Sequence, residues 1–198
     1  MANLQASLRG QYAVALEDLP QLLKSVNQLF YENTGDSTYA TMFFGDYQDQ
    51  TRRLHYANCG HNPPILLRSG GSIERLASTA TVLGLFEDWE CRTCDVEIAA
   101  GDILVIYTDG ITEATGEGGD EFGEGQLVDV IRNESFAPVP SILDAVLGAV
   151  RNSAEVSKRT TSRWWLLAVA RFLTARISSA GRPCWPSPRP TITCPYCT

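Results

Sequence analysis

The 198-residue chain lacks several features that would place it in a common class of protein. No apolar run approaches the roughly 20 residues that a membrane-spanning helix requires, and the longest, Trp164–Leu173, contains Arg171. The N-terminus has no charged segment followed by an apolar one, as a secretory signal would have. The two histidines belong to no readable Ser/His/Asp or Cys/His set, and no glycine-rich phosphate loop is present. We therefore expect a cytoplasmic protein that does not associate with membranes.

Acidic and basic residues are divided unevenly along the chain. Residues 1–150 have 22 acidic and 8 basic side chains, a net charge of −14. Residues 151–198 have one acidic and 8 basic side chains, a net charge of +7. A basic segment can bind nucleic acid or an anionic membrane. Here the basic residues are scattered among proline, tryptophan and cysteine without forming a cluster, so we expect neither partner.

The six cysteines do not have the spacing of a zinc site. The pairs Cys91–Cys94 and Cys194–Cys197 each read C-x-x-C, but about 100 residues separate them, far more than structural zinc sites use. Cys91 and Cys94 also lie in an alternating, strand-like stretch, where an odd separation directs two side chains to opposite faces. Cys59 and Cys184 add no further ligand pattern. We expect no structural zinc.

Helices are predicted on both sides of a central β region. Residues 2–15 are rich in Ala, Leu and Gln and contain no proline. Asp18-Leu-Pro20 opens a second helix, because aspartate caps helix N-termini and proline is tolerated in the first turn. Its apolar residues recur at helical spacing, and they are Leu22, Leu23, Val26, Leu29 and Phe30. Residues 123–133 and 141–150 predict two later helices.

Between these helices the apolar residues recur with a period near two. The pattern predicts strands at residues 40–47, 53–58, 65–67, 72–76, 96–99 and 103–107. The first two strands form a hairpin that turns at 49–51, and the next two form a hairpin that turns at 69–71. Helices, then antiparallel strands, then helices indicate an α/β sandwich with helices packed on sheets.

The run Gly101–Ala114 contains the strongest functional signal. Its apolar strand Ile103–Tyr107 ends in Thr-Asp109-Gly, where glycine permits a sharp turn that leaves the carboxylate exposed at the strand tip. A carboxylate fixed there can hold a hard divalent cation such as Mg²⁺ or Mn²⁺. The alternative is that Asp109 only caps a turn after a core strand.

The segment Gly101–Ala114 resembles the metal-ligand segment of the bacterial PPM-type serine/threonine phosphatases, in particular the SpoIIE-like branch. Four further segments resemble landmarks of this family in the same order, and they are Tyr39–Gly45, Leu54–Pro64, Val82–Leu85 and Glu121–Gly123. The resemblance covers about residues 1–150. It implies a PPM-phosphatase-like α-β-β-α sandwich, of the α/β class and incomplete at both ends.

The resemblance also implies an activity and a partner. The family hydrolyses phosphoserine or phosphothreonine on a regulatory protein at a two-metal site that holds Mn²⁺ or Mg²⁺. Its typical partner is a phosphorylated anti-anti-sigma-factor-like protein, and a homodimer is compatible with the resemblance. Nothing in the sequence identifies a catalytic side chain outside the metal site. The alternative is a non-catalytic signalling module that retains the fold.

Only one of the family's metal-binding segments is readable here. The family uses an early Asp-x-x-Gly-His-Gly segment, the Thr-Asp-Gly turn and a late Asp-Asp-x-Thr strand, and this chain has the middle one, as Asp109. The early segment would precede Met1, so we expect a longer parent protein and little activity from the chain as written. His61, in its Gly-His-Asn-Pro turn, is expected to take part in a structural hydrogen bond, and His55 is expected to face solvent.

The resemblance stops near Arg151, where the family has its last core strand. In a shifted reading frame, the third base of each codon joins the first two bases of the next codon. Read in this frame, the codons of Ser157–Trp165 permit Glu-Gln-Glu-Asp-Asp-Leu-Thr-Val-Val, in which the last valine is forced. We therefore infer a frameshift near Arg151 or Asn152, genuine or a sequencing error, that leaves a partial PPM domain at 1–151 and an aberrant basic Pro/Cys-rich tail at 152–198. An unrelated extension and a codon coincidence are the alternatives. The apolar stretch Trp164–Arg171 is the local candidate to replace the last strand.

Overall fold

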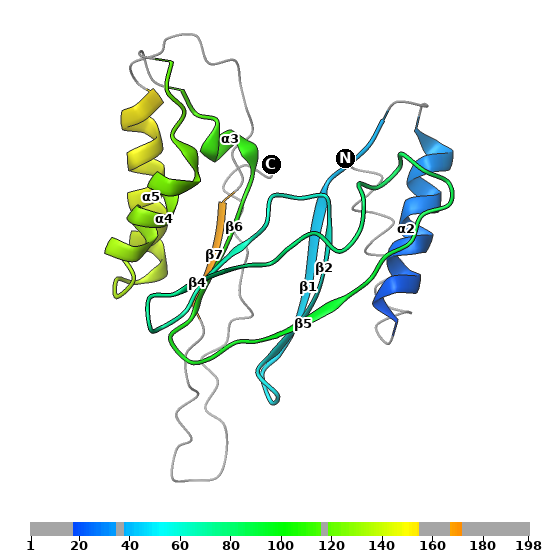
Figure 1. The fold of residues 1–198 in the computed structure, drawn as a ribbon, viewed down its shortest axis with the longest axis horizontal. Coiled ribbons are helices and arrows are strands. Elements are labelled where there is room, and N and C mark those ends of the chain that lie inside the picture. The colour runs from blue at the N-terminus through cyan, green and yellow to red at the C-terminus, as the bar shows by residue number, and fades with distance from the viewer. Residues whose placement is uncertain (1–17, 35–37, 116–118, 155–166, 172–198) are drawn as a thin grey trace. The chain divides into compact units, whose positions relative to one another are not determined.

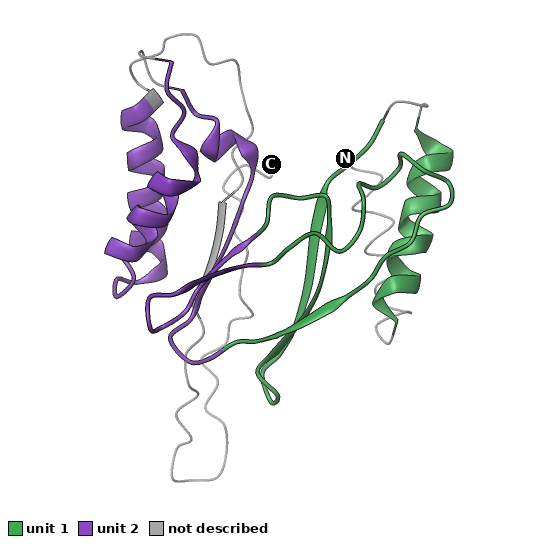
Figure 2. Ribbon diagram, viewed as in Figure 1, with its two compact units in different colours: residues 1–63, 76–98 green, residues 64–75, 99–198 purple. Residues whose placement is uncertain are grey.

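The computed structural model describes residues 18–34, 38–115, 119–154 and 167–171, which divide into two compact units (Figures 1 and 2). Unit 1 contains the described residues up to Pro63 together with Leu76–Ile98, and unit 2 contains Pro64–Arg75 and the described residues from Ala99 onward. The helix predicted at residues 2–15 lies outside the described residues. No helix in the described part of the chain has both the length and the apolar character needed to cross a membrane.

In unit 1, helix α2 (Leu19–Asn33) begins where the sequence predicts it. The Asp18 carboxylate accepts a 3.1 Å hydrogen bond from the backbone N–H of Gln21, which satisfies one of the free donors of the first turn. The buried face of the helix packs against β2 residues Ala57 and Cys59 in one apolar cluster. The helical residues of that cluster are Leu19, Leu22, Leu23 and Val26. The predicted face is therefore confirmed, although Leu29 and Phe30 at its end are only half-buried.

The sheet of unit 1 is antiparallel with strand order β1-β2-β5. Its strands are β1 (Met42–Gln48), β2 (Arg53–Cys59) and β5 (Cys94–Glu97). The first predicted hairpin is confirmed. The predicted strand at 96–99 is shifted, because the backbone N–H of Ala99 donates to the Asp102 carboxylate (2.9 Å) instead of continuing the ladder.

In unit 2, four strands form an antiparallel sheet with the order β4-β3-β6-β7. They are β3 (Ile65–Leu67), β4 (Ile73–Arg75), β6 (Ile103–Tyr107) and β7 (Leu167–Arg171). The short helix α3 (Asp109–Thr112) follows β6, and α4 (Gly123–Asn133) and α5 (Val139–Ala154) cover one face of the sheet (Figure 1). The core between sheet and helices includes Ile65, Ile103, Val105, Leu127, Ile131, Ile142 and Val146. The second hairpin, the β6 strand and both later helices are thus confirmed.

The last strand of the sheet comes from the segment that follows the change in charge. Leu167–Arg171 pairs with β6 in an antiparallel register that joins Tyr107 to Leu167 and Ile103 to Arg171. The expectation that the apolar stretch ending at Arg171 would fill this position is confirmed for residues 167–171. Its first residues, Trp164–Leu166, lie outside the described residues.

Candidate metal site

Asp109 lies where the buried strand β6 ends and helix α3 begins. Ile103, Val105 and Tyr107 are buried in the core of unit 2, whereas Asp109 is exposed. The backbone after the strand closes at once into a helical turn, in which the Glu113 N–H donates to the Asp109 carbonyl (2.7 Å) and the Ile111 N–H donates to the Thr108 carbonyl (3.0 Å). A carboxylate on a short turn anchored to a buried strand is well placed to act as a ligand. The predicted exposure at the strand tip is confirmed.

The turn after Asp109 does not use the conformational freedom of glycine, contrary to the sequence-based prediction. Gly110 is a buried residue of helix α3 and does not have a positive φ. Strand β6 passes directly into a right-handed helical turn, whose backbone dihedrals are available to any residue. The carboxylate is therefore exposed because it begins a helix, and not because of a left-handed turn.

A polar contact that the sequence did not indicate fixes the end of β6. The Tyr107 hydroxyl donates to Glu124 Oε2 (3.0 Å), and Arg75 Nε donates to Glu124 Oε1 (2.7 Å). Burial, followed by the hydrogen bond to Glu124, raises the pKa of Tyr107, so the phenol stays neutral. These contacts join β6, α4 and β4 two residues before Asp109. They hold the strand end on which the candidate ligand depends.

The described residues alone do not fit a two-metal centre. Within the described ranges, no three His, Cys, Asp or Glu side chains come together as a metal site. A carboxylate-bridged pair of divalent ions needs several such ligands from separate segments. Asp109 is exposed at the strand tip, and its role as a metal ligand stays a prediction.

The Asn-x-Gly-His turn after β2 is held by Asn58, which is fully buried. Asn58 Oδ1 accepts from the His61 backbone N–H (2.8 Å), and Asn58 Nδ2 donates to the Leu76 carbonyl (3.1 Å). The predicted hydrogen bond within the turn is confirmed only for the His61 backbone, because the ring Nδ1 lies 3.4 Å from Thr41 Oγ1, outside the turn. His55 lies on β2 with its side chain 35% exposed and 3.1 Å from Asp95, so the prediction that it faces solvent holds in part.

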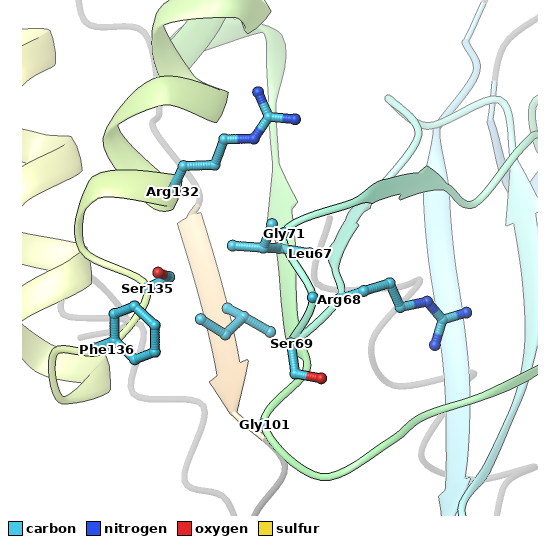
Figure 3. A pocket seen from close by; sticks show the side chains of 10 residues that line it. Leu67, Arg68, Ser69, Gly71, Gly101, Arg132, Ser135 and Phe136 are labelled. Atoms are coloured by element: carbon cyan, nitrogen blue, oxygen red, sulfur yellow. The ribbon is translucent and has the colours of Figure 1, made fainter.

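A pocket in unit 2 lies beside the first residues of β6 (Figure 3). Asp109 follows the other end of this strand. The volume of the pocket is about 510 Å³. The lining residues are Leu67, Arg68, Ser69, Gly70, Gly71, Gly101, Ile103, Arg132, Ser135 and Phe136. None of them is a carboxylate, so this pocket is not the predicted metal site.

The fold is that of PPM-type phosphatases, also called PP2C-type. The solved structure of the SiaA-PP2C domain of Pseudomonas aeruginosa matches with a TM-score of 0.74 at 19% identity, covering 86% of this chain and 68% of that chain. The family model of stage II sporulation protein E (SpoIIE) matches residues 1–161. The chain belongs to the SpoIIE family. This finding confirms the resemblance carried by the five ordered segments.

Two curated relatives show the extent of the similarity. The phosphoserine phosphatase RsbU of Bacillus subtilis is 29% identical over 113 residues, which are 53% of this chain and 34% of RsbU. Protein IcfG of Synechocystis is 30% identical over 137 residues, which are 69% of this chain and 22% of IcfG. The chain therefore spans about a third or less of the length of these relatives.

Proposed function

We propose that the chain is part of a cytoplasmic phosphatase domain that hydrolyses phosphoserine or phosphothreonine on a regulatory protein. Membership of the SpoIIE family and the similarity to the phosphoserine phosphatase RsbU support this activity. The same fold occurs in the solved RsbU and RsbW domains of Rv1364c from Mycobacterium tuberculosis, with a TM-score of 0.68 at 20% identity. The family resemblance implies a role in sigma-factor regulation, and we propose a phosphorylated anti-anti-sigma-factor-like protein as the substrate.

The observation on which the proposal depends is the exposed Asp109 carboxylate at the tip of buried strand β6. We propose that it binds Mn²⁺ or Mg²⁺. A manganese-soaked SpoIIE phosphatase domain of Bacillus subtilis and RsbX in complex with magnesium share the fold, with TM-scores of 0.59 and 0.55. The ions would neutralise phosphoryl oxygens and activate water when the full ligand set is present. The Asp-Asp-Leu-Thr read in the shifted frame would supply further carboxylates.

The test compares the chain as written with a protein in which the shifted frame is restored and any coding sequence before Met1 is included. Hydrolysis of p-nitrophenyl phosphate and binding of Mn²⁺ by calorimetry are measured for both. The chain as written is expected to show little turnover, because one carboxylate cannot hold two divalent ions. In the restored protein, Asp109→Asn should lower turnover by about 100-fold or more.

The matched control is Asp144→Asn, which removes a carboxylate from the exposed surface of helix α5 in the same unit. It should leave both metal binding and turnover unchanged. Full turnover in restored Asp109→Asn would contradict the ligand role of Asp109. Turnover by the chain as written at the level of an intact relative, lost in Asp109→Asn, would contradict the proposed need for further ligands.

A second candidate function is a non-catalytic interaction module. It is favoured by one observation, the lack of a three-ligand metal cluster among the described residues. The encoding DNA distinguishes the two candidates. An upstream Asp-x-x-Gly-His-Gly segment together with an open shifted frame would support the phosphatase, and the lack of both would support the module.

A further inference from the structure

Two cysteines that are distant in the sequence meet inside unit 1. Cys59 ends strand β2 and is fully buried, and Cys91 lies half-buried in the segment before β5. Cys91 packs against the apolar cluster that contains Cys59. The other cysteine of the C-x-x-C sequence, Cys94, begins β5 and is exposed. The fold therefore brings Cys91 to the cluster that contains Cys59, whereas Cys94 is exposed on β5.

The backbone holds the two cysteine-containing segments on a common intermediate, residues Thr79 and Ala80. Ala80 forms a parallel bridge with Cys59, and the Thr79 N–H donates to the Asn58 carbonyl (2.9 Å). On the other side, the Arg92 N–H donates to the Thr79 carbonyl (3.4 Å). Both cysteines are thus next to residues that are hydrogen-bonded to the same short segment, which limits how far apart their side chains can move.

The two thiols differ in reactivity. The neighbouring Cys59 thiol lowers the pKa of Cys91, while burial opposes this effect and Thr79 adds to it. The neighbouring Cys91 thiol, together with burial, raises the pKa of Cys59. Because the thiolate is the nucleophile, Cys91 is the thiol that reacts first. It is also the more accessible of the two.

We propose that Cys59 and Cys91 form a reversible disulfide when the protein meets a hydroperoxide. The Cys91 thiolate attacks the distal peroxide oxygen, the O–O bond breaks, and the alkoxide leaves as an alcohol after taking up a proton, which leaves a sulfenic acid on Cys91. The Cys59 sulfur then attacks the Cys91 sulfur, the S–O bond breaks, and water leaves with the Cys59 proton. Two thiols are oxidised and one hydroperoxide is reduced to an alcohol and water.

The disulfide would tie the end of β2 to the segment that leads into β5. The loop that it closes includes the turn held by Asn58 and the Thr79–Ala80 segment. A crosslink that closes such a loop stabilises a fold, because it restricts the unfolded chain. The oxidised protein should therefore melt at a temperature several degrees above that of the reduced protein. This inference does not depend on the proposed phosphatase activity.

Tryptic mapping tests the pairing directly, because Arg92 separates Cys91 from Cys94. The full chain is treated with tert-butyl hydroperoxide, denatured, alkylated and digested without reductant. The expected product joins the peptide of residues 54–68 to that of residues 76–92, with the loss of two hydrogen atoms and release by dithiothreitol. A link from 54–68 to 93–132 would show that Cys94 is the partner and would overturn the proposal. So would alkylation of both Cys59 and Cys91 after oxidation, or their conversion to sulfinic acid without a link.

Two variants provide matched controls. Cys91→Ser should abolish both the crosslink and the rise in melting temperature on oxidation, whereas Cys94→Ser should retain both. The melting temperature of each reduced variant shows whether it is folded. If Cys91→Ser is folded and still melts at a higher temperature after oxidation, the effect comes from another cysteine and the proposal is wrong.

Discussion

The buried carboxylate of Asp102 accepts a 2.9 Å hydrogen bond from Arg68 Nη1 and so joins the turn before β6 to the hairpin β3–β4. The same carboxylate accepts from the backbone N–H groups of Ser69 and Ala99, each at 2.9 Å. Asp102 is 1% exposed, so these donors replace the water that the ion loses on folding. This one side chain therefore organises both loops at the end of the sheet opposite Asp109.

The first prediction concerns the stability of this arrangement. Asp102→Ala should lower the free energy of unfolding by about 3 kcal/mol, because it leaves two backbone donors and the Arg68 guanidinium without their buried acceptor. Urea denaturation measures the change. Asp95→Ala is the control, since Asp95 is 51% exposed in its pair with His55 and should cost less than about 1 kcal/mol. Equal losses of unfolding free energy in the two variants would contradict the role of Asp102 as a buried acceptor that stabilises the fold.

Local patterns in the sequence were sufficient to predict the main elements of the fold. Strand β6 (Ile103–Tyr107) and helix α4 (Gly123–Asn133) have the predicted bounds, because their apolar residues and flanking turn residues lie within a few positions of one another. The resemblance to the family was likewise based on short segments in a fixed order. Such local signals are readable without knowledge of tertiary contacts.

Contacts between distant residues could not be predicted in this way. The sequence shows Asp102 only as part of a Gly-Asp turn, and its partner Arg68 is 34 positions away. The proximity of Cys59 and Cys91 could not be predicted for the same reason, because C-x-x-C is a short-range pattern and these two cysteines are far apart in the sequence. The sequence correctly predicted that Asp109 is exposed at the end of β6, but it misjudged Gly110, which is a buried residue of helix α3.

The second prediction concerns Gly84, in one of the family landmarks. Gly84 has φ of +83°, and a Cβ there would overlap the ring of Phe30 and lie 3.2 Å from the Thr38 carbonyl oxygen. Its N–H also donates to the buried Asn27 Oδ1 (2.8 Å), which fixes the backbone. Gly84→Ala should therefore destabilise the protein by about 2 kcal/mol or more in thermal or urea unfolding.

The control for Gly84 is Gly148→Ala in helix α5, where a new Cβ meets no atom within 4 Å. That change should stabilise the protein by about 0.5–1 kcal/mol, because alanine loses less backbone freedom than glycine in a helix. A neutral Gly84→Ala would show that Phe30 can move away at little cost, and it would contradict the close packing described for this landmark.

The third prediction concerns pH. Because burial and the Glu124 hydrogen bond raise the pKa of Tyr107, the unfolded chain releases the phenolic proton at a lower pH than the folded protein does. The contribution of Tyr107 to the free energy of unfolding is complete below the unfolded pKa of about 10. It is lost as the pH rises above that value. The stability of the protein relative to Tyr107→Phe should then fall by up to about 1.4 kcal/mol per pH unit.

Urea denaturation at pH 8 and pH 10.5 measures this difference. At pH 8, Tyr107→Phe should be less stable than the unchanged protein by about 1 kcal/mol, the contribution of one hydrogen bond. Tyr39→Phe, which changes an exposed side chain, should retain the pH response of the unchanged protein. The proposed neutral state of Tyr107 is wrong if Tyr107→Phe responds to pH as Tyr39→Phe does.

The last prediction concerns the frame after Arg151. In the chain as written, the strand that pairs with β6 is Leu167–Arg171, and Glu155 is the sole acid beyond residue 150. In the shifted frame, the codons of the stretch overlapping Ser157–Trp165 permit Asp-Asp-Leu-Thr-Val-Val, an apolar strand preceded by two carboxylates. If this strand replaces Leu167–Arg171 beside β6, its first residues lie at the end where Asp109 is exposed, because the pairing is antiparallel.

The restored protein should therefore bind Mn²⁺ more tightly, and its better-matched last strand should raise the soluble yield. Calorimetry and the soluble fraction of matched expressions measure the two effects, and Asp109→Asn in the restored protein should remove the gain in affinity while keeping the gain in yield. A restored protein that is no more soluble and binds Mn²⁺ no better than the chain as written would exclude the frameshift and favour an unrelated C-terminal extension.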